Sequence, residues 1–204
     1  HNLKNTTLSL NTRVESVNDK EIILKNNKRL QSDFAIIATD ASHLAIDLEK
    51  NPIKWKSCHN LYFEVENRVI SQKLIGLIPK CGALINNIFY GTSLKTVPHP
   101  KKECLSVTVI DNKGLSNSEL IERVKQELID YCSIENCTFL KYYSIPIGLP
   151  ELSDVQYEIS PDNTSLTDRV FLAGDTQLNG SLNAAIISGE RAAQGVLEAI
   201  SSFK

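Results

Sequence analysis

The hydrophobic pattern of the first fifty residues is that of short strands. Residues 7–17 (TLSLNTRVESV) alternate between apolar and polar positions, which is the period of a half-buried strand. A second strand is predicted at Glu21–Lys25, between turns rich in Asn and Asp. The apolar run Phe34–Ala38 predicts a buried strand, and either Thr39 or Asp40 can cap a short helix that continues through Glu49. The chain thus begins as a β-meander that leads into a buried strand.

The middle of the chain has a different pattern, which indicates a mostly antiparallel sheet and one helix. Ser116 and Glu119 form an S-x-x-E capping box, and Leu120, Val124 and Leu128 recur on one helical stripe behind it. Strands at hairpin-like spacing are predicted at 59–66, 73–79, 83–91, 104–111 and 138–146, the last of them ended by Pro146.

A strand followed by a glycine turn closes the chain. Val170–Ala173 is apolar throughout, as expected for a strand that is covered on both faces. Gly174 leaves room for a ligand at the carboxyl end of this strand, where open α/β sheets bind their ligands. The carboxylate of Asp175 suits a ribose-like or ribityl hydroxyl, or a water beside a phosphate, and would repel a bare phosphate.

A long helix of small residues follows this turn. Ser181 opens the helix, and Leu182, Asn183 and Ala184 are expected to present unpaired backbone N–H groups in its first turn. Such groups favour a partner that carries or develops negative charge. The alternative is a tightly packed terminal helix with a glycine turn and no ligand, because short glycine patterns occur widely.

These segments predict an α/β fold with an α+β insert. We assign 1–50 and 165–204 to one α/β domain, and 51–164 to a second domain inserted between its two halves. The chain contains no methionine, even at position 1, so we expect a fragment that lacks its natural N-terminal part.

Composition excludes several function classes. The net charge of −2 provides no basic surface for nucleic acid, and the apolar runs are too short for a membrane span. No charged-then-apolar leader opens the sequence, and we expect a cytoplasmic protein. The five cysteines form no Cys-x-x-Cys pair, which favours reduced, mostly buried thiols and no metal site.

Two separate segments carry a family resemblance. "RVFLAGD…GSLNAAIISGERAA" resembles the C-terminal FAD motif of flavin-containing amine oxidases, phytoene desaturases and protoporphyrinogen oxidases. "LNTRVESVNDKEIILKNNKRLQSDFAIIATD" resembles the meander of the same family, and the two occur in the family's order. The resemblance implies that the outer parts are the remainder of a Rossmann-like FAD-binding domain, and that the insert is a substrate domain.

The resemblance also implies roles for individual residues. Val14 matches the position whose backbone meets the adenine, and Ala38 and Thr39 match a strand end near the cofactor. Asp175 matches the acidic residue near the ribityl and pyrophosphate groups. The start of the long helix matches the segment beneath the flavin pyrimidine ring. The resulting set of cofactor-binding candidates is Val14, Ala38, Thr39, Gly174, Asp175, Ser181, Leu182, Asn183 and Ala184.

One departure from the family pattern limits what this chain is expected to do. The family's G-x-G-x-x-G turn, which docks the pyrophosphate, does not occur in these 204 residues. The chain by itself should therefore bind FAD weakly or not at all. The full-length protein is expected to be an FAD-dependent oxidoreductase that takes hydride from an amine or an apolar hydrocarbon. The alternative is a non-catalytic relative or interaction domain that does not bind FAD.

The insert offers no sharp catalytic constellation. His59 is expected to lie at a strand start in a turn or surface role, and His43 and His99 look exposed. At most one of Tyr142 and Tyr143 can line a pocket, because adjacent strand residues face opposite sides. The expected partner is a small-molecule substrate, whose identity stays open, as does the oligomeric state.

Overall fold

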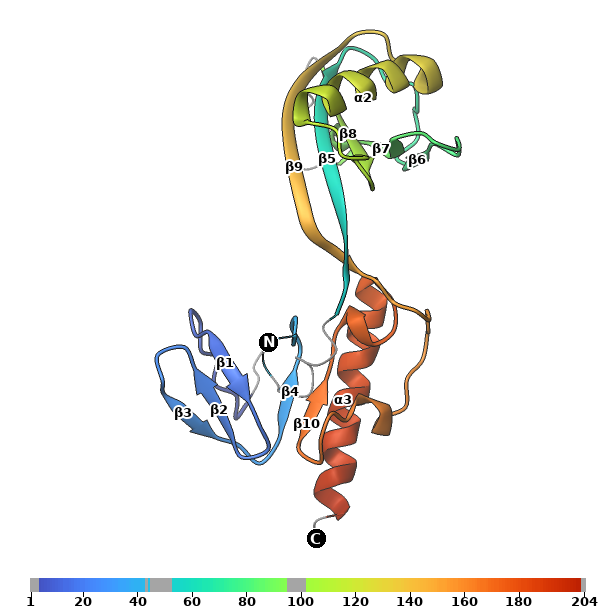
Figure 1. Ribbon diagram of the computed structural model, residues 1–204. Coiled ribbons are helices and arrows are strands. Elements are labelled where there is room, and N and C mark those ends of the chain that lie inside the picture. Colours follow the sequence, from blue (N-terminus) through green and yellow to red (C-terminus); the bar gives the residue numbers. More distant parts are fainter. Residues whose placement is uncertain (1–3, 43, 45–52, 95–101, 203–204) are drawn as a thin grey trace. The chain divides into compact units, whose positions relative to one another are not determined.

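The computed structural model describes residues 4–42, 44, 53–94 and 102–202. The chain divides into two compact units. Unit 1 contains His1–Lys54 and Pro150–Lys204, and unit 2 contains Trp55–Leu149. Both units mix helices with sheets (Figure 1).

Unit 1 begins with the predicted meander. It is a three-stranded antiparallel sheet in the order β1-β2-β3, with β1 at Val14–Val17, β2 at Glu21–Leu24 and β3 at Arg29–Gln31. The alternating pattern of residues 7–17 predicts a longer strand than β1, because residues 7–13 lie outside any strand and are exposed. Alternation by itself does not make a strand where no neighbour pairs with it.

A second, parallel pair of strands joins distant parts of unit 1. Strand β4 (Ala35–Ile37) lies beside β10 (Val170–Leu172), and Phe171 pairs with Ile36 (Figure 1). Ala35 and Ile37 are buried, whereas Ile36 is 42% exposed, so the prediction of a buried strand holds for only one face of β4. The predicted helix through Glu49 lies largely outside the described residues.

Helix α3 (Leu182–Ser202) completes unit 1 and packs along β10. Its buried residues are all small: Ala184, Ser188, Ala192 and Gly195. A Cβ at Gly195 would lie 2.8 Å from a ring carbon of Phe171 and 3.0 Å from the Pro161 carbonyl oxygen. Gly195 is therefore required for the close approach of the helix to the strand. Two short 3-10 helices, η2 (Asp162–Thr164) and η3 (Asp175–Gln177), flank β10 in sequence.

Unit 2 is a five-stranded sheet covered on one face by a helix. The strand order is β6-β7-β8-β5-β9 and the resolved pairings are antiparallel, as predicted. The strands are β5 (Trp55–Val65), β6 (Gly76–Leu77), β7 (Ile85–Tyr90), β8 (Glu103–Val109) and β9 (Cys137–Pro150), with a 3-10 turn, η1 (Gly91–Ser93), after β7.

Helix α2 (Asn117–Cys132) starts at the predicted capping box. The Ser116 side chain accepts from the Glu119 N–H, and the Glu119 carboxylate accepts from the Ser116 N–H at 2.9 Å. Leu120, Val124 and Leu128 are fully buried against the sheet. The predicted stripe is therefore confirmed, and it places the core of unit 2 between α2 and the sheet.

Strand β9 continues beyond the point at which the sequence pattern ended it. It runs from Cys137 to Pro150 and passes through Pro146. The strand lies at the edge of the sheet. Proline removes a backbone donor, and an edge strand can place that position on its unpaired side. The predicted end at Pro146 is therefore wrong, because the position of a strand within its sheet is not a local property.

Candidate functional site

The carboxyl ends of β4 and β10 lie side by side in unit 1. The pairing of Leu172 with Ile37 continues in a 2.9 Å bond from the Ala173 N–H to the Ile37 carbonyl. Parallel pairing brings the two strand ends to the same edge of the sheet. Ala38 and Thr39 are exposed at this edge, next to the segment that leads to Gly174. The structure thus brings together site candidates from both outer segments.

Gly174 occupies a backbone conformation that favours glycine. Its φ is 131° and its ψ is 175°, a region that residues with a Cβ rarely adopt. A Cβ built at this position would meet only the Thr176 hydroxyl, at 3.9 Å. The space beside the strand end is open, so a bound group can approach the backbone here.

Asp175 begins η3 directly after this glycine. The turn is closed by bonds from the Gln177 N–H to the Gly174 carbonyl at 3.2 Å and from the Leu178 N–H to the Asp175 carbonyl at 3.4 Å. Leu178 is buried and anchors the turn, while Asp175 itself is half-buried. The carboxylate is therefore held at the strand end on a short, anchored turn.

The start of α3 differs in one respect from the expectation. The Ser181 hydroxyl accepts the Ala184 N–H at 3.2 Å, and the Ser181 carbonyl accepts the Ala185 N–H at 3.1 Å. Ser181 acts as the N-cap, so the Ala184 N–H is engaged and its predicted unpaired state is wrong. Leu182, which is 77% exposed, and the exposed Asn183 have no earlier helical turn whose carbonyls their N–H groups could reach.

Val14 lies in the meander, and it packs against an apolar cluster that includes residues of β4 and β10. It packs, half-buried, against the cluster that contains Val17, Ala35, Ile37 and Val170. Its pairing with Leu24 is followed by a register shift in β1. The meander and the β4–β10 pair therefore share one core, which fixes Val14 relative to the strand ends.

Unit 2 contains a polar pair that the sequence analysis misjudged. His59 is only 8% exposed, and its Nδ1 lies 2.7 Å from the Tyr142 hydroxyl. The two rings are stacked, with centroids 5.9 Å apart and an interplanar angle of 9°. His59 lies within β5, so the expected place at a strand start and the expected surface role are both wrong. His43 and His99 lie outside the described residues.

The two tyrosines of β9 make different contacts, as the alternation of a strand predicts. Tyr142 packs against the main core of unit 2, whereas Tyr143 is 52% exposed and lies edge-on to Tyr62. No local signal in the sequence reveals these partners, because His59 and Tyr142 are 83 residues apart.

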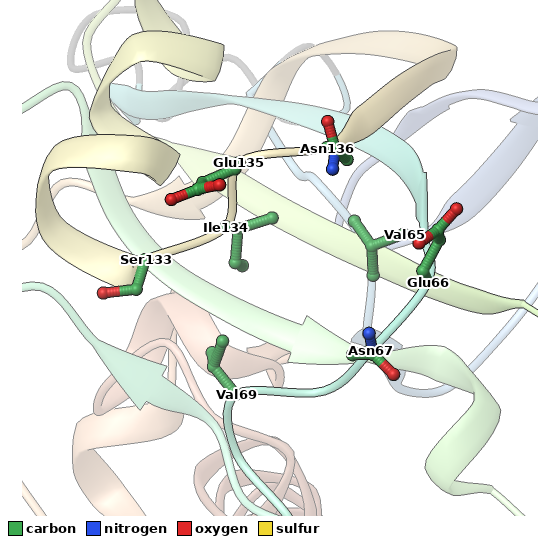
Figure 2. A pocket seen from close by; sticks show the side chains of 8 residues that line it. All are labelled: Val65, Glu66, Asn67, Val69, Ser133, Ile134, Glu135 and Asn136. Carbon is green, nitrogen blue, oxygen red and sulfur yellow. The ribbon is translucent and has the colours of Figure 1, made fainter.

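A small cavity lies at one end of unit 2. It has a volume of about 190 Å³ and is surrounded by the end of β5, the segment after it and the loop from α2 to β9 (Figure 2). Val65, Val69 and Ile134 supply its apolar part, and the carboxylates of Glu66 and Glu135 lie among its polar side chains. None of the predicted cofactor-binding residues lines this cavity.

The cysteines are free thiols. Cys81 is exposed and the other four are half-buried, so the expectation of mostly buried thiols holds only in part. Burial raises the pKa of Cys104, Cys132 and Cys137. Across the described ranges, no cluster of His, Cys, Asp and Glu side chains is arranged to hold a metal ion. The described helices also include none whose length and apolar character would suffice to cross a membrane.

Comparison with known families agrees with this arrangement. Residues 2–197 match the family of flavin containing amine oxidoreductases. The chain belongs to this family. No curated protein sequence matches the chain significantly.

Solved structures share the fold at low sequence identity. A reduced UDP-galactopyranose mutase is 14% identical with a TM-score of 0.66, and the match covers 91% of this chain and 46% of that one. An oxidoreductase from Methanosarcina mazei is 13% identical with a TM-score of 0.62, covering 89% and 48%. A putrescine oxidase variant redesigned in cofactor binding is 14% identical with a TM-score of 0.59, covering 92% and 48%. The chain spans about half the length of these structures.

Proposed function

We propose that the chain is part of an FAD-dependent oxidoreductase. In this proposal unit 1, which holds 1–50 and 165–204, is the remainder of the FAD-binding domain. Unit 2, which makes up most of 51–164, is the substrate domain. The observation that carries the proposal is the junction of β10, Gly174 and α3 within a chain of this family. When bound, FAD supplies the acceptor for a hydride taken from the substrate.

The residues at the strand ends fit a flavin cofactor. Open space beside the Gly174 backbone permits close approach of a flat group. The Asp175 carboxylate can accept a hydrogen bond from a hydroxyl of the ribityl chain. Ala38 and Thr39 lie at the same edge and would border the cofactor from β4. These residues bind and orient, and they leave the redox chemistry to the cofactor.

The start of α3 supplies the electrostatic part of the proposed site. The first-turn N–H groups of Leu182 and Asn183, together with the helix dipole, favour a ring that gathers negative charge when it is reduced. Ser181 and Ala184 would hold this turn in place through the N-cap bond. Val14 would contribute backbone contacts to the adenine from the meander.

Flavin titration of the 204-residue chain tests this proposal. The expected result is weak, saturable quenching of FAD and riboflavin fluorescence, because the sequence has no G-x-G-x-x-G turn to hold the pyrophosphate. Asp175→Ala should weaken FAD binding by about fivefold to tenfold through loss of a charge-assisted hydrogen bond. Asp154→Ala, which changes an exposed carboxylate of the connector, is the matched control.

Two outcomes contradict the proposal. If the full-length protein carries no flavin absorption, unit 1 is not part of a flavin site. If Asp154→Ala weakens binding as much as Asp175→Ala, the effect is one of net charge alone. The first outcome favours the alternative of a non-catalytic relative that does not bind FAD.

A further inference from the structure

The sheet of unit 2 has two different faces. Leu61 and Phe63 of β5 are fully buried on the face that packs against α2. The intervening residues Asn60 and Tyr62 point to the other face, which is half-exposed. Asn60 pairs with Thr108 of β8, and Tyr62 pairs with Ser106. We call the half-exposed surface of Asn60, Tyr62, Phe89, Ser106, Thr108 and Tyr143 the Asn60 face.

A hydrogen-bond network fixes the polar groups of the Asn60 face. The Asn60 Oδ1 accepts from the hydroxyls of Ser106 at 3.3 Å and Thr108 at 3.2 Å. The Asn60 Nδ2 donates to the Tyr62 hydroxyl at 3.1 Å. This directs the Ser106 and Thr108 protons toward Asn60 and leaves their oxygen lone pairs as acceptors. In the part of the chain that the structure describes, the Tyr62 hydroxyl proton meets no acceptor.

Aromatic rings flank this polar network. The Tyr62 and Tyr143 rings lie 5.9 Å apart, edge to face at 89°. Phe89 of β7 pairs with Ser106 on the other side. The face therefore offers apolar ring surfaces around a fixed polar set, in which the Tyr62 hydroxyl and the second Asn60 N–H can donate and the Ser106 and Thr108 oxygens can accept. An alternating set of C–H and O–H groups on a ligand matches such a surface.

The charged groups beside the Asn60 face already have partners, which distinguishes between ligand classes. Glu64 follows Tyr62 on the same face of β5, and its Oε1 lies 2.6 Å from the Lys102 ammonium. The Lys141 ammonium lies 5.9 Å from the Tyr143 ring centroid, at the β9 edge. A cationic amine would lose hydration here without an unpaired carboxylate to meet it. A hydrocarbon would cover the Tyr62 donor and the hydroxyl acceptors without replacing their water bonds.

We infer that the Asn60 face binds an uncharged molecule rich in hydroxyl groups, with the chemistry of a sugar or polyol. That this face is the substrate surface rests on the proposed function. The inference names a neutral, hydroxylated substrate class in place of an amine or a hydrocarbon. The Tyr62 hydroxyl donates to the ligand, the Ser106 and Thr108 oxygens accept from it, and the aromatic rings contact its C–H groups.

Nuclear magnetic resonance of the 204-residue chain with labelled tyrosine and phenylalanine tests the inference. Three probes are titrated separately without FAD: glucose, benzylamine and decanol. Glucose should shift the ring signals of Tyr62, Tyr143 and Phe89 saturably, and should leave Tyr157 of unit 1, which is 75% exposed, unchanged. Tyr62→Phe should weaken glucose binding by about fivefold through loss of one hydrogen bond, while Tyr131→Phe on the exposed side of α2 should not change it.

The outcomes separate this inference from the proposed function. The inference would be overturned if the ring signals of the Asn60 face showed tighter binding of benzylamine or decanol than of glucose. It would also be overturned if glucose shifted none of these signals. An equal effect of Tyr62→Phe and Tyr131→Phe would also overturn it. Flavin titration of the same sample reports on unit 1 independently. Flavin binding without glucose binding therefore refutes only the inference, and glucose binding combined with a full-length protein that carries no flavin refutes only the proposed function.

Discussion

The Ser188 hydroxyl fastens helix α3 to Gly174 at the end of β10. It accepts the Gly174 N–H at 2.8 Å and donates to the Gly174 carbonyl oxygen at 2.9 Å, sharing its proton with the Ala185 carbonyl at 3.0 Å. Ser188 is fully buried. One side chain thus satisfies both backbone groups of the residue with φ of 131°, and sets the strand end relative to the helix start.

Replacement of this serine should destabilise unit 1. Ser188→Ala leaves the half-buried Gly174 N–H without its partner, while the Gly174 carbonyl keeps its bond from the Gln177 N–H, so we expect the free energy of unfolding to fall by about 1–3 kcal/mol. Urea denaturation measures the change. Ser201→Ala removes an exposed hydroxyl from the same helix and should change stability by less than about 0.5 kcal/mol. Equal stability of the two variants would show that the bonds to Gly174 are dispensable.

Two glycines of α3 should respond in opposite directions to the same substitution. Gly195→Ala forces a Cβ to within 2.8 Å of the Phe171 ring, and should destabilise the chain by about 1–3 kcal/mol. Gly189→Ala meets nothing within 4 Å. It should stabilise the chain by about 0.5–1 kcal/mol through higher helix propensity. Thermal unfolding of both variants checks the signs, and a stabilising Gly195→Ala would contradict the packing described for the helix.

A buried carboxylate of α2 should be essential for unit 2. Glu127 is 6% exposed, and its carboxylate accepts the N–H groups of Leu84 at 2.9 Å and Ile85 at 3.0 Å. Glu127→Gln keeps one oxygen for these donors but places an amide N–H₂ group against the Leu84 N–H, and should cost about 1.5–3 kcal/mol in the free energy of unfolding. Glu122→Gln on the exposed side of the same helix is the control. Similar urea midpoints for both variants would refute a special role of Glu127.

The capping box should make α2 sensitive to acid. Hydrogen bonds from the Ser116 side chain and backbone hold the pKa of Glu119 below its ordinary value. A carboxyl whose folded pKa is depressed stabilises the fold above its unfolded pKa, and this contribution is lost as the pH falls through the folded pKa. Glu119→Gln should therefore flatten the stability profile between about pH 5 and pH 3. Circular dichroism at a series of pH values measures this, and an unchanged slope would refute it.

Thiol labelling should distinguish the five cysteines. Cys81 is exposed, whereas burial raises the pKa of Cys104, Cys132 and Cys137 and keeps them in the unreactive thiol form. Iodoacetamide at about pH 8, near the ordinary pKa of cysteine, should modify Cys81 at least about tenfold faster than these three. Peptide mass spectrometry locates the modified residues. In urea the modification rates of these cysteines should become similar. Similar rates without denaturant would contradict the described burial.

The sequence by itself determined features that depend on neighbouring residues. The capping box at Ser116 and the buried stripe of Leu120, Val124 and Leu128 follow from contacts within one or two helical turns, and both are present. The Gly174–Asp175 turn likewise follows a short apolar strand and precedes a helix of small residues. Such local patterns were sufficient to predict the fold class and the family.

Only the tertiary structure decided the features that depend on distant partners. Strand β1 is limited to Val14–Val17 by the length of its pairing with β2, and β9 passes Pro146 because it lies at a sheet edge. His59 is buried because Tyr142, far away in sequence, supplies its hydrogen bond. Pairing, burial and hydrogen-bond satisfaction are set by the whole fold, so no local period of apolar residues can encode them.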